Sequence, residues 1–548
     1  MNGRRVALPQ GKVLGGSSAI NLLVNVYPSK SGIDAWDKLG NPGWNWDTLA
    51  PYYRKYHTFH TPSQQTSHRL ALGYLDKDLQ GATGPIQTSF AEDNLPLTEA
   101  WPKTFKNLNF AMTEDPLSGE AKGGFSNSSS VDPRTKIRSY AGNAYYNLEV
   151  RNRLNLHVLT ETLVEKVIFD KLDNEGATDA SVSAIAVQVI DKNGKSHMFR
   201  GNKEIILAAG CLQSPKVLQL SGIGDKRLLE SHGISTVINN EYVGKNLQDH
   251  PYASLSFEVA DGVQTGDIMG DPKVVEALMA QYQTSRSGPF AAGAASSQAY
   301  MPLVDFLDNK GRSELTQLLE EFVDKNLNDA EFPAKKQQFD LLRSILESSD
   351  DASIQYLMAP LQYNSSAGPD IKAMYSLERP GNYMTILTCL SHPFSRGNVQ
   401  IHSSDPKEKP TFNPNYLSHP LDLEILARHL QYLEILTHTQ PLASMLKENG
   451  RRIPEGKFVG DLSSAKEHAI RAFVSNYHPS GSCAMMPKEL GGVVNERLVV
   501  HGTRNLRIVD ASIFPLSPRG NIQSSVYAVA ERAADLTKQD LSERAEIT

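Results

Sequence analysis

The 548-residue chain is 40% hydrophobic and 21% charged, which is typical of a globular protein and argues against intrinsic disorder. Its formal net charge of −6 is spread along the chain without a basic stripe, so nucleic acid is not an expected partner. The apolar runs fall far short of the roughly 20 residues that span a bilayer, so no membrane partner is expected, and the three cysteines fit neither a disulfide framework nor a zinc ribbon.

A run of small residues lies near the start of the chain, in the sequence GKVLGGSSAIN at residues 11–21. Closely spaced glycine and serine let a backbone approach a large anion or a flat ring. The N–H groups of such a loop can also hold phosphate oxygens. We therefore interpret residues 11–21 as a cofactor cradle.

The next elements are predicted from residue pattern. A helix is expected around residues 49–57, followed by a long irregular stretch to about residue 150, of the kind that lines sites or covers other elements. Two β-branched, half-alternating runs at residues 163–169 and 182–190 are separated by polar residues. This arrangement predicts a hairpin.

A strand followed directly by a helix is predicted after the hairpin. Residues 203–210 form a short apolar run that ends in glycine, as expected of a buried strand in a layered α/β sheet. Ser214 is expected to cap the following helix, with Pro215 at its first position and its end near residues 221–222.

The second half of the chain is predicted to contain several helices. Apolar residues at positions 315, 318, 319, 322 and 323 have helical spacing and indicate an amphipathic surface helix, with a substrate lid as the alternative. Residues 391–402 predict a strand, residues 422–438 a helix, and residues 505–510 a short strand that ends in an acid. A final helix with one apolar face is expected after residue 521.

One histidine is a candidate for acid–base chemistry. His478 lies in the sequence NYHPSGSCAMM at residues 476–486. A lone loop histidine is more often structural, but an imidazole can accept the hydroxyl proton of an alcohol at neutral pH while the adjacent carbon loses a hydride. This chemistry needs one base near the substrate oxygen and no metal.

Three segments resemble signatures of the glucose-methanol-choline (GMC) flavoprotein oxidoreductases: residues 11–36, 208–224 and 476–486. The resemblance extends from residue 5 to about residue 536. It implies an α/β fold of mixed α+β character, with a Rossmann-like FAD-binding domain interleaved with a substrate domain built on an antiparallel sheet. The implied FAD-binding domain comprises residues 1–36, 150–255 and 485–548, and the substrate domain and lid comprise residues 37–149 and 256–484.

The resemblance also implies roles for particular residues. His478 would face the flavin as the base, and Asn521 matches a position that is histidine or asparagine in the family. An amide can hold the alcohol oxygen but is no useful base, and the alternative role for Asn521 is a helix cap. Ile20 stands where some members attach FAD through histidine, so non-covalent FAD is expected. The implied cofactor-binding residues are Gly15, Gly16, Ser17, Asn21, Val164, Asp510 and Ala511.

Two of these implied contacts have a plainer alternative. Val164 sits in a β-branched run, where a valine is ordinarily part of the core. Asp510 follows a short strand, where an aspartate commonly closes a turn. Either residue therefore fits a structural role as well as a cofactor contact.

The printed chain departs from the family pattern before the Gly-Ser loop. In the family, a strand–turn–helix unit with G-x-G-x-x-G precedes this loop and binds the ADP half of FAD, and a later acidic residue holds the ribose. We expect the sequence to be an N-terminally truncated record of a working enzyme that, as written, holds FAD weakly. Localisation therefore stays open between secretion and the cytoplasm.

The expected function is the FAD-dependent oxidation of a small-molecule alcohol to an aldehyde or ketone, by hydride transfer to flavin N5. O₂ or another electron acceptor would reoxidise the flavin. The segment at residues 410–422 is similar to fungal members, which include enzymes of secondary metabolism. Two alternatives stay open: a non-catalytic relative that has lost FAD, and a redox-neutral lyase or dehydratase on the same fold.

Overall fold

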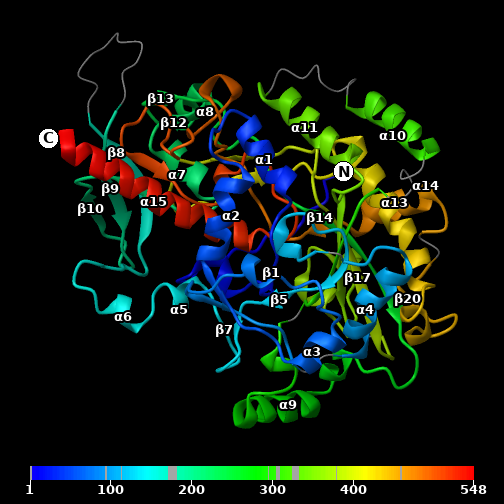
Figure 1. The fold of residues 1–548 in the computed structure, drawn as a ribbon. Helices are drawn as coiled ribbons and strands as arrows, with labels where there is room; N and C mark the ends of the chain where they lie inside the picture. Colours follow the sequence, from blue (N-terminus) through cyan, green and yellow to red (C-terminus); the bar gives the residue numbers. More distant parts are fainter. Residues whose placement is uncertain are drawn as a thin grey trace.

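The fold is a mixture of helices with parallel and antiparallel strands, which confirms the predicted α/β class with α+β character (Figure 1). It is described from a computed structural model. Long antiparallel strands occupy one side of the molecule in Figure 1, and a smaller sheet with the last helix occupies the other. The structure describes residues 3–92, 95–112, 114–170, 182–293, 295–303, 309–323, 332–377, 379–456 and 459–547.

The largest sheet has seven strands and is antiparallel. Its order is β20-β14-β17-β16-β15-β4, with β21 also paired to β14. Helices α13 and α14 pack against β14, and α13 also packs against β16 and β17, so the helices and the sheet share one core. The bounds are β4 Gly123–Ser126, β14 Pro251–Glu258, β15 Ser297–Met301, β16 Ile354–Ala359, β17 Tyr383–Leu390, β20 Arg452–Ile453, β21 Val474–Ser475, α13 Pro420–Thr437 and α14 Leu462–Ala472.

Strand β14 spans the expected domain boundary at residue 255, because all eight of its residues belong to this one sheet. The division of the chain into two interleaved domains stays a prediction.

The predicted hairpin is confirmed. Strands β8 and β9 pair antiparallel, with Leu163 opposite Ile190, and β10 extends them to three strands. Helix α15 and these strands both appear on the left of the view in Figure 1. The bounds are β8 Leu163–Phe169, β9 Ala184–Ile190, β10 Ser196–Arg200 and α15 Gln523–Ile547.

A parallel pair of strands joins residues that are about 300 positions apart. Strand β11 (Ile205–Leu207) pairs with β22 (Leu506–Ile508), which confirms both predicted strands with shorter bounds. The expectation of full burial was wrong for β11. Its two end residues are 7% exposed, but Ile206, which points to the opposite face, is 48% exposed.

Helix α7 (Ser214–Leu220) begins one residue earlier than predicted, and Ser214 is not its cap. The Ser214 hydroxyl donates a hydrogen bond to the Asp510 carboxylate and accepts one from the Ala209 N–H at 3.2 Å. A side chain held by these partners is not free to cap the helix. Ser214 therefore ties the β11–α7 turn to the end of β22.

The other predicted elements are present with shifted ends. Helix α2 covers Trp46–Lys55, and the amphipathic helix α10 covers Asn309–Phe322, with Leu315 and Leu319 buried. Of the predicted strand at 391–402, only Asn398–Gln400 is a strand, β18. The remaining bounds are α1 Lys30–Lys38, α3 Gln64–Arg69, α4 Pro96–Asn107, α5 Ala141–Ala144, α6 Leu148–Arg151, α8 Lys226–Ser231, α9 Pro272–Ser285, α11 Lys335–Glu347, α12 Ile371–Met374, β1 Val24–Asn25, β2 His57–Phe59, β3 Ile86–Thr88, β5 Ser128–Ser129, β6 Val131–Asp132, β7 Ile137–Arg138, β12 Ile223–Gly224, β13 Ile238–Asn239 and β19 Thr411–Asn413.

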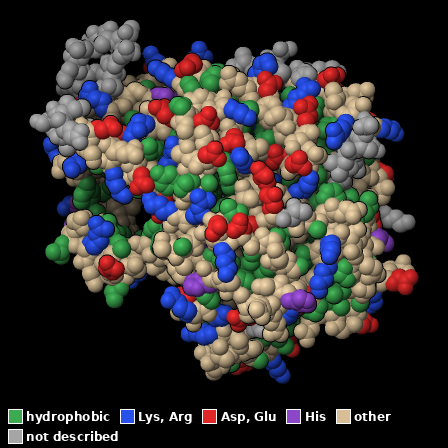
Figure 2. Space-filling view, in the orientation of Figure 1, with side chains coloured by type: hydrophobic (Ala, Val, Ile, Leu, Met, Phe, Trp, Pro, Cys, Tyr) green, Lys and Arg blue, Asp and Glu red, His purple; other side chains and the backbone are tan. Residues whose placement is uncertain are grey.

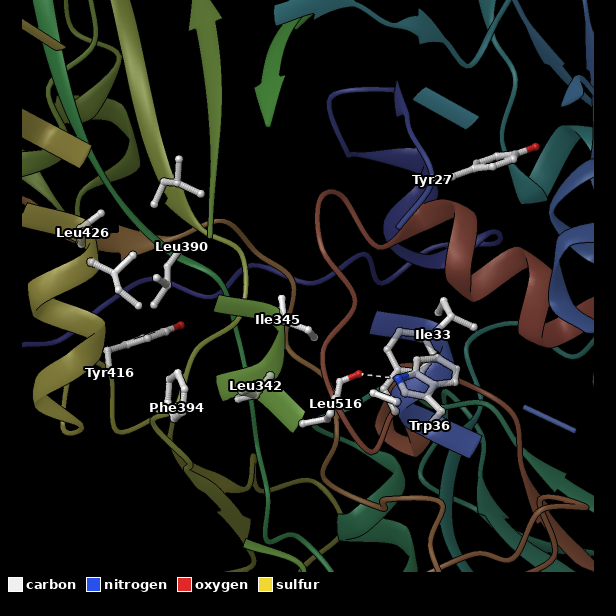
Figure 3. Packing of buried hydrophobic residues seen from close by; sticks show 14 of the residues in the cluster. Tyr27, Ile33, Trp36, Leu342, Ile345, Leu390, Phe394, Tyr416, Leu426 and Leu516 are labelled. Atoms are coloured by element: carbon white, nitrogen blue, oxygen red, sulfur yellow. Dashed lines mark hydrogen bonds between the residues drawn. The ribbon is translucent and has the colours of Figure 1, made fainter. Parts of the chain in front are cut away.

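A continuous core connects α1 with the loop that precedes α15 and with helices α11 and α13 (Figure 3). Trp36 of α1 is fully buried, and its indole Nε1 donates to the Leu516 carbonyl at 3.0 Å. Buried aromatic side chains contribute large apolar areas to folding. This packing fixes the loop at residues 510–522, which carries Asn521.

The surface carries both signs of charge. Figure 2 shows Lys and Arg side chains intermingled with Asp and Glu over one face of the molecule. Such a surface produces no large field of a single sign on that face. None of the helices in the described ranges is both long and apolar enough to cross a lipid bilayer.

Candidate active site

His478 lies in a buried loop just after β21, at the end of the large sheet where β14 begins. Its backbone N–H donates to Asp249 Oδ1 at 2.9 Å, and its side chain is only 8% exposed. The preceding Tyr477 has φ +63°, a left-handed conformation uncommon for a bulky residue, and its N–H donates to Ser475 Oγ at 2.7 Å. Specific contacts therefore fix the backbone on both sides of the histidine.

The structure brings the two predicted catalytic residues together. The Asn521 side-chain nitrogen lies 3.3 Å from His478 Nε2. The Asn521 oxygen accepts a hydrogen bond from Gln355 Nε2 at 3.0 Å, and the same nitrogen of Gln355 donates to Gln298 Oε1 at 2.8 Å. Asn521 thus turns its amide nitrogen toward the imidazole. Helix α15 begins two residues later, and the amide is engaged by the site rather than by that helix.

A second histidine touches the first. His250 Nδ1 lies 3.0 Å from His478 Nδ1, the two rings are nearly perpendicular, and His250 is fully buried just before β14. The other ring nitrogen of His250 lies 3.2 Å from Ser517 Oγ. Sequence reasoning missed His250 because the two histidines are 228 residues apart and no local pattern connects them.

A single buried carboxylate holds both histidine backbones. Asp249 Oδ1 accepts the N–H of His250 at 2.8 Å and that of His478 at 2.9 Å. Its other oxygen accepts the hydroxyl groups of Tyr416 and Ser475. Four donors around one carboxylate produce a rigid joint between two loops. The adjacent acid and histidine at Asp249 and His250 were the signal in the sequence that could have indicated this joint.

Burial sets the protonation of these groups. It lowers the pKa of His478 well below its usual value, and the neighbouring His250 lowers it further. Burial also lowers the pKa of His250 to about 3. It raises the pKa of Asp249 to about 6, although its four hydrogen bonds act in the opposite direction. At neutral pH both imidazoles are therefore neutral, and His478 has a nitrogen lone pair available to accept a proton.

Tyrosines surround the loop that carries His478. Tyr252 and Tyr363 share a hydrogen bond between their hydroxyl groups, and Tyr375 packs edge-on against Tyr363 with ring centroids 4.8 Å apart. Tyr477 is close enough to Tyr375 for the two hydroxyls to influence each other's ionisation. These side chains supply flat apolar surfaces with polar tips beside the base.

The Gly-Ser loop forms a single 3-10 turn at Gly16–Ala19, and its side chains hold the loop itself. Ser17 Oγ accepts the N–H of Gly11 at 3.1 Å. Asn21 accepts a hydrogen bond from Arg138 at 2.8 Å and donates one to Gln523, the first residue of α15. The predicted cradle therefore lies at the N-terminus of α15. The first residue of that helix, Gln523, is two positions after Asn521.

The other predicted cofactor residues lie on other elements. The Asp510 carboxylate accepts hydrogen bonds from the Gly210 N–H at 3.0 Å, the Ser214 hydroxyl and the Ser512 N–H at 2.8 Å, so it joins β22 to the β11–α7 turn. Ala511 follows directly after it. Val164 lies on β8 and is 36% exposed, not in the core. A contact of these three residues with a cofactor stays a prediction.

The residues around the cradle fit a flavin nucleotide. A Cβ built on Gly16 meets nothing within 4 Å, so the backbone there borders open space. The positive end of the 25-residue helix α15 lies beside the loop, and helix N-termini favour anions. Val13, Ile20 and Leu22 expose about half of their apolar side chains in the same loop, which suits contact with a flat ring.

Comparisons with known proteins agree with this arrangement. The sequence models of the GMC oxidoreductases match residues 1–252 and 393–530. The GMC oxidoreductase family protein Mala s 12 of Malassezia sympodialis is 34% identical over 547 residues, which cover 98% of this chain and 81% of that protein. Dehydrogenase mpl7 of Monascus purpureus is 30% identical over 550 residues, with coverages of 98% and 85%.

The three-dimensional comparison supports the same assignment. An FAD-dependent oxidoreductase from Chaetomium thermophilum superimposes with a TM-score of 0.86 at 26% identity, over 99% of this chain and 88% of the other. Together with the family matches, this similarity confirms the fold and the resemblance that the motifs indicated. The chain therefore belongs to the GMC oxidoreductase family.

Proposed function

We propose that this protein oxidises an alcohol to an aldehyde or ketone with non-covalently bound FAD, using His478 as the base. Membership of the GMC oxidoreductases and the similarity to an FAD-dependent oxidoreductase imply FAD. The observation that carries the proposal is the pair His478–Asn521, in which a neutral imidazole nitrogen and an amide N–H meet at 3.3 Å. A proton acceptor and a donor side by side can hold one hydroxyl group between them.

His478, Asn521 and Asp249 each have a separate role in this reaction. His478 Nε2 accepts the hydroxyl proton of the alcohol, and the Asn521 N–H holds the oxygen as negative charge develops on it. Asp249 keeps the histidine loop in place, and burial of His478 limits the access of water to the base. FAD, when held by the Gly-Ser loop and the start of α15, supplies the acceptor for the hydride that leaves the substrate carbon.

The test is flavin reduction. Protein loaded with FAD is mixed anaerobically with a panel of aliphatic and benzylic alcohols, and the flavin absorbance is followed. We expect bleaching with at least one alcohol, and His478→Ala to slow it by a factor on the order of 10²–10⁴ with flavin content retained. Benzylic alcohols belong in the panel because tyrosines surround the site.

The alternatives give different results in the same experiment. A non-catalytic relative leaves the flavin oxidised with every alcohol. A lyase or dehydratase converts its substrate while the flavin absorbance stays constant. An unchanged rate of bleaching in His478→Ala would remove this histidine from the role of base.

A further inference from the structure

The hydrogen bonds around Asn521 determine where the protons of His478 lie. Gln355 Nε2 carries two N–H groups and donates to the oxygens of both Gln298 and Asn521. Asn521 must then present its NH₂ group to His478 Nε2, which can accept that bond only with a free lone pair. A neutral His478 therefore carries its proton on Nδ1.

The same reasoning extends to His250. The 3.0 Å contact between the two Nδ1 atoms needs one N–H and one lone pair. Since His478 Nδ1 donates, His250 Nδ1 accepts. A neutral His250 then carries its proton on Nε2, which faces Ser517 Oγ at 3.2 Å. Every ring nitrogen of the pair has a partner that matches this assignment.

We propose that His250 is a positioning residue that shares the Nδ1 proton of His478 while His478 takes up the substrate proton. The inference rests on the proposed function. When the substrate O–H bond breaks and a bond from that proton to His478 Nε2 forms, the proton on His478 Nδ1 shifts toward His250 Nδ1 and is shared by the two nitrogens. The positive charge is then spread over both imidazoles, while the hydride from the substrate carbon goes to the flavin-type acceptor.

The surroundings leave this second imidazole as the acceptor for the shared proton. Within the part of the chain that the structure describes, neither ring has a carboxylate as a hydrogen-bond partner. Asp249 contacts only the backbone N–H groups of the pair and the hydroxyls of Tyr416 and Ser475. His392 lies near His250, and the Arg519 guanidinium lies near His392.

His392 and Arg519 differ in how they affect the positive charge that His250 can carry. The Arg519 guanidinium would oppose a full charge on His250, since like charges raise each other's energy, whereas burial lowers the pKa of His392 to about 3 and keeps it neutral. A proton shared across the 3.0 Å contact leaves less charge on His250 than complete transfer would. The neighbourhood therefore favours sharing within the pair.

The proton assignment can be tested without activity and without flavin. Protein labelled with ¹⁵N-histidine is examined by NMR at neutral pH, with signals assigned from the variants His250→Gln and His478→Gln. We expect a protonated Nδ1 and a lone-pair Nε2 in His478, and the reverse in His250. A His478 ring protonated at Nε2 would overturn the proposal.

The kinetic test compares two replacements of His250. In His250→Gln the amide oxygen can still accept the Nδ1 proton of His478 but cannot take it, whereas His250→Phe removes the acceptor altogether. We expect the rate of flavin reduction to fall about 10-fold in the glutamine variant and about 10²-fold in the phenylalanine variant, with KM changed much less. A wild-type rate in His250→Gln would overturn proton sharing.

A pH profile separates this role from a merely structural one. Loss of the acceptor removes a hydrogen bond to the charged form of His478, and it also removes the effect by which His250 lowers the pKa of His478, so the acid limb of kcat/KM should move in His250→Phe. His429→Gln is the matched control, because His429 is also buried but binds Ser353 and Tyr356 instead of the histidine pair. An acid limb that stays in place in His250→Phe would contradict the proposal.

Failure of the proposed function gives a different signature. If no alcohol bleaches the flavin of the wild-type protein, the oxidation is wrong, yet the NMR experiment still decides the proton positions of the pair. If alcohols are oxidised and His250→Gln and His250→Phe both keep the wild-type rate, only the inference about His250 is wrong.

Discussion

His478 and Asn521 meet at 3.3 Å but have different chemical capacities. Asparagine can orient an oxygen and cannot take its proton, so Asn521→Ala should slow flavin reduction less than His478→Ala does. The pH dependence set by the histidine should persist in Asn521→Ala. Rapid-mixing reduction kinetics across a pH series measure both effects.

Folding of the Asn521→Ala protein, followed by circular dichroism, is the control for that comparison. Gln355→Leu is a matched variant, because it removes the partner that orients the Asn521 amide and leaves the amide itself in place. A loss of pH dependence in Asn521→Ala would show that His478 does not set the pH dependence independently of Asn521.

The proximity of His478 and Asn521 was predictable from the sequence because each residue sits in a recognisable motif. His250, Asp249 and Gln355 were not, since their roles depend on contacts that span 166 to 229 residues. Ser214 shows the reverse case. It has the residue type and position of a cap, but a distant carboxylate engages its hydroxyl.

At the level of elements, substitutions of two neighbouring glycines in the cradle are expected to differ in their effect on stability. A Cβ on Gly15 would lie 2.5 Å from the backbone nitrogen of Gly142, so Gly15→Ala should destabilise the fold with or without FAD. Gly16 has φ +57° and open space around it, so Gly16→Ala should cost only about 1–2 kcal/mol. Thermal unfolding of both variants provides the comparison.

Flavin titration completes that test. Because the open side of Gly16 is where the cradle would contact FAD, Gly16→Val should weaken FAD binding more than it lowers the unfolding temperature. Equal FAD affinity in Gly16→Val and in the unchanged protein would place the cofactor elsewhere.

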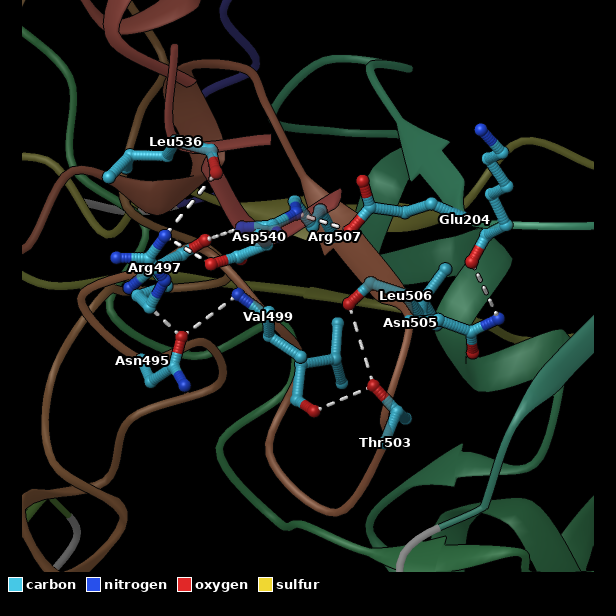
Figure 4. Close-up of polar contacts among 12 residues, drawn as sticks. Glu204, Asn495, Arg497, Val499, Thr503, Asn505, Leu506, Arg507, Leu536 and Asp540 are labelled. Atoms are coloured by element: carbon cyan, nitrogen blue, oxygen red, sulfur yellow. Dashed lines mark hydrogen bonds and ion pairs between the residues drawn. The ribbon is translucent and has the colours of Figure 1, made fainter. Parts of the chain in front are cut away.

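A buried ion cluster joins the parallel strands to the last helix (Figure 4). Arg507 of β22 is fully buried and binds Glu204 beside β11 and Asp540 of α15, and Arg497 also binds Asp540. Removing one member of such a cluster leaves unpaired buried charge. We expect Arg507→Met to lower the free energy of unfolding by about 3–5 kcal/mol.

Chemical unfolding of two further variants checks that the loss comes from unpaired charge. Lys226→Met breaks an exposed ion pair with Glu230 and should change stability by less than about 0.5 kcal/mol. Replacing Arg507, Glu204 and Asp540 together by apolar residues should recover part of the loss. A triple variant no more stable than Arg507→Met would point to lost packing as the cause.

The elements were predicted well wherever their signal is local. The β8–β9 hairpin and helix α13 follow from residue periodicity, and their ends differ by only a few residues. The exposure of Ile206 on β11 was not predictable, because an apolar strand looks the same whether one or both of its faces are covered. The order of the seven strands also came only from the structure.

Across the whole molecule, buried histidines predict sensitivity to acid. Burial lowers the pKa to about 3 for His57, His250, His392 and His429, and to about 4 for His419 and His468. Between these values and about 6.5 the unfolded chain binds more protons, so stability must fall as the pH falls. The raised pKa values of Asp115, Asp249, Asp267 and Asp422 act in the opposite direction, but they are four groups against these six histidines and His478, whose pKa burial also lowers.

Thermal unfolding at pH 7.5 and at pH 5.5 measures this slope. We expect a clearly lower midpoint at pH 5.5, and a flatter dependence in His429→Phe, which removes one titrating group outside the histidine pair. Each histidine can contribute up to about 1.4 kcal/mol per pH unit. A midpoint that is the same at both pH values would show that the folded and unfolded chains bind protons equally over this range, so that these histidines keep ordinary pKa values.

The hydrogen bonds of Asp249 determine when the site around His478 can form during folding. The Asp249 carboxylate links two backbone groups separated by 229 residues, so the contact closes a very long loop of chain. Contacts of such sequence separation form slowly, after local hairpins and helices are already present. During refolding, circular dichroism should therefore recover before alcohol oxidation does. Because the contacts that hold His478 come from distant parts of the chain, we expect this site to form late in folding.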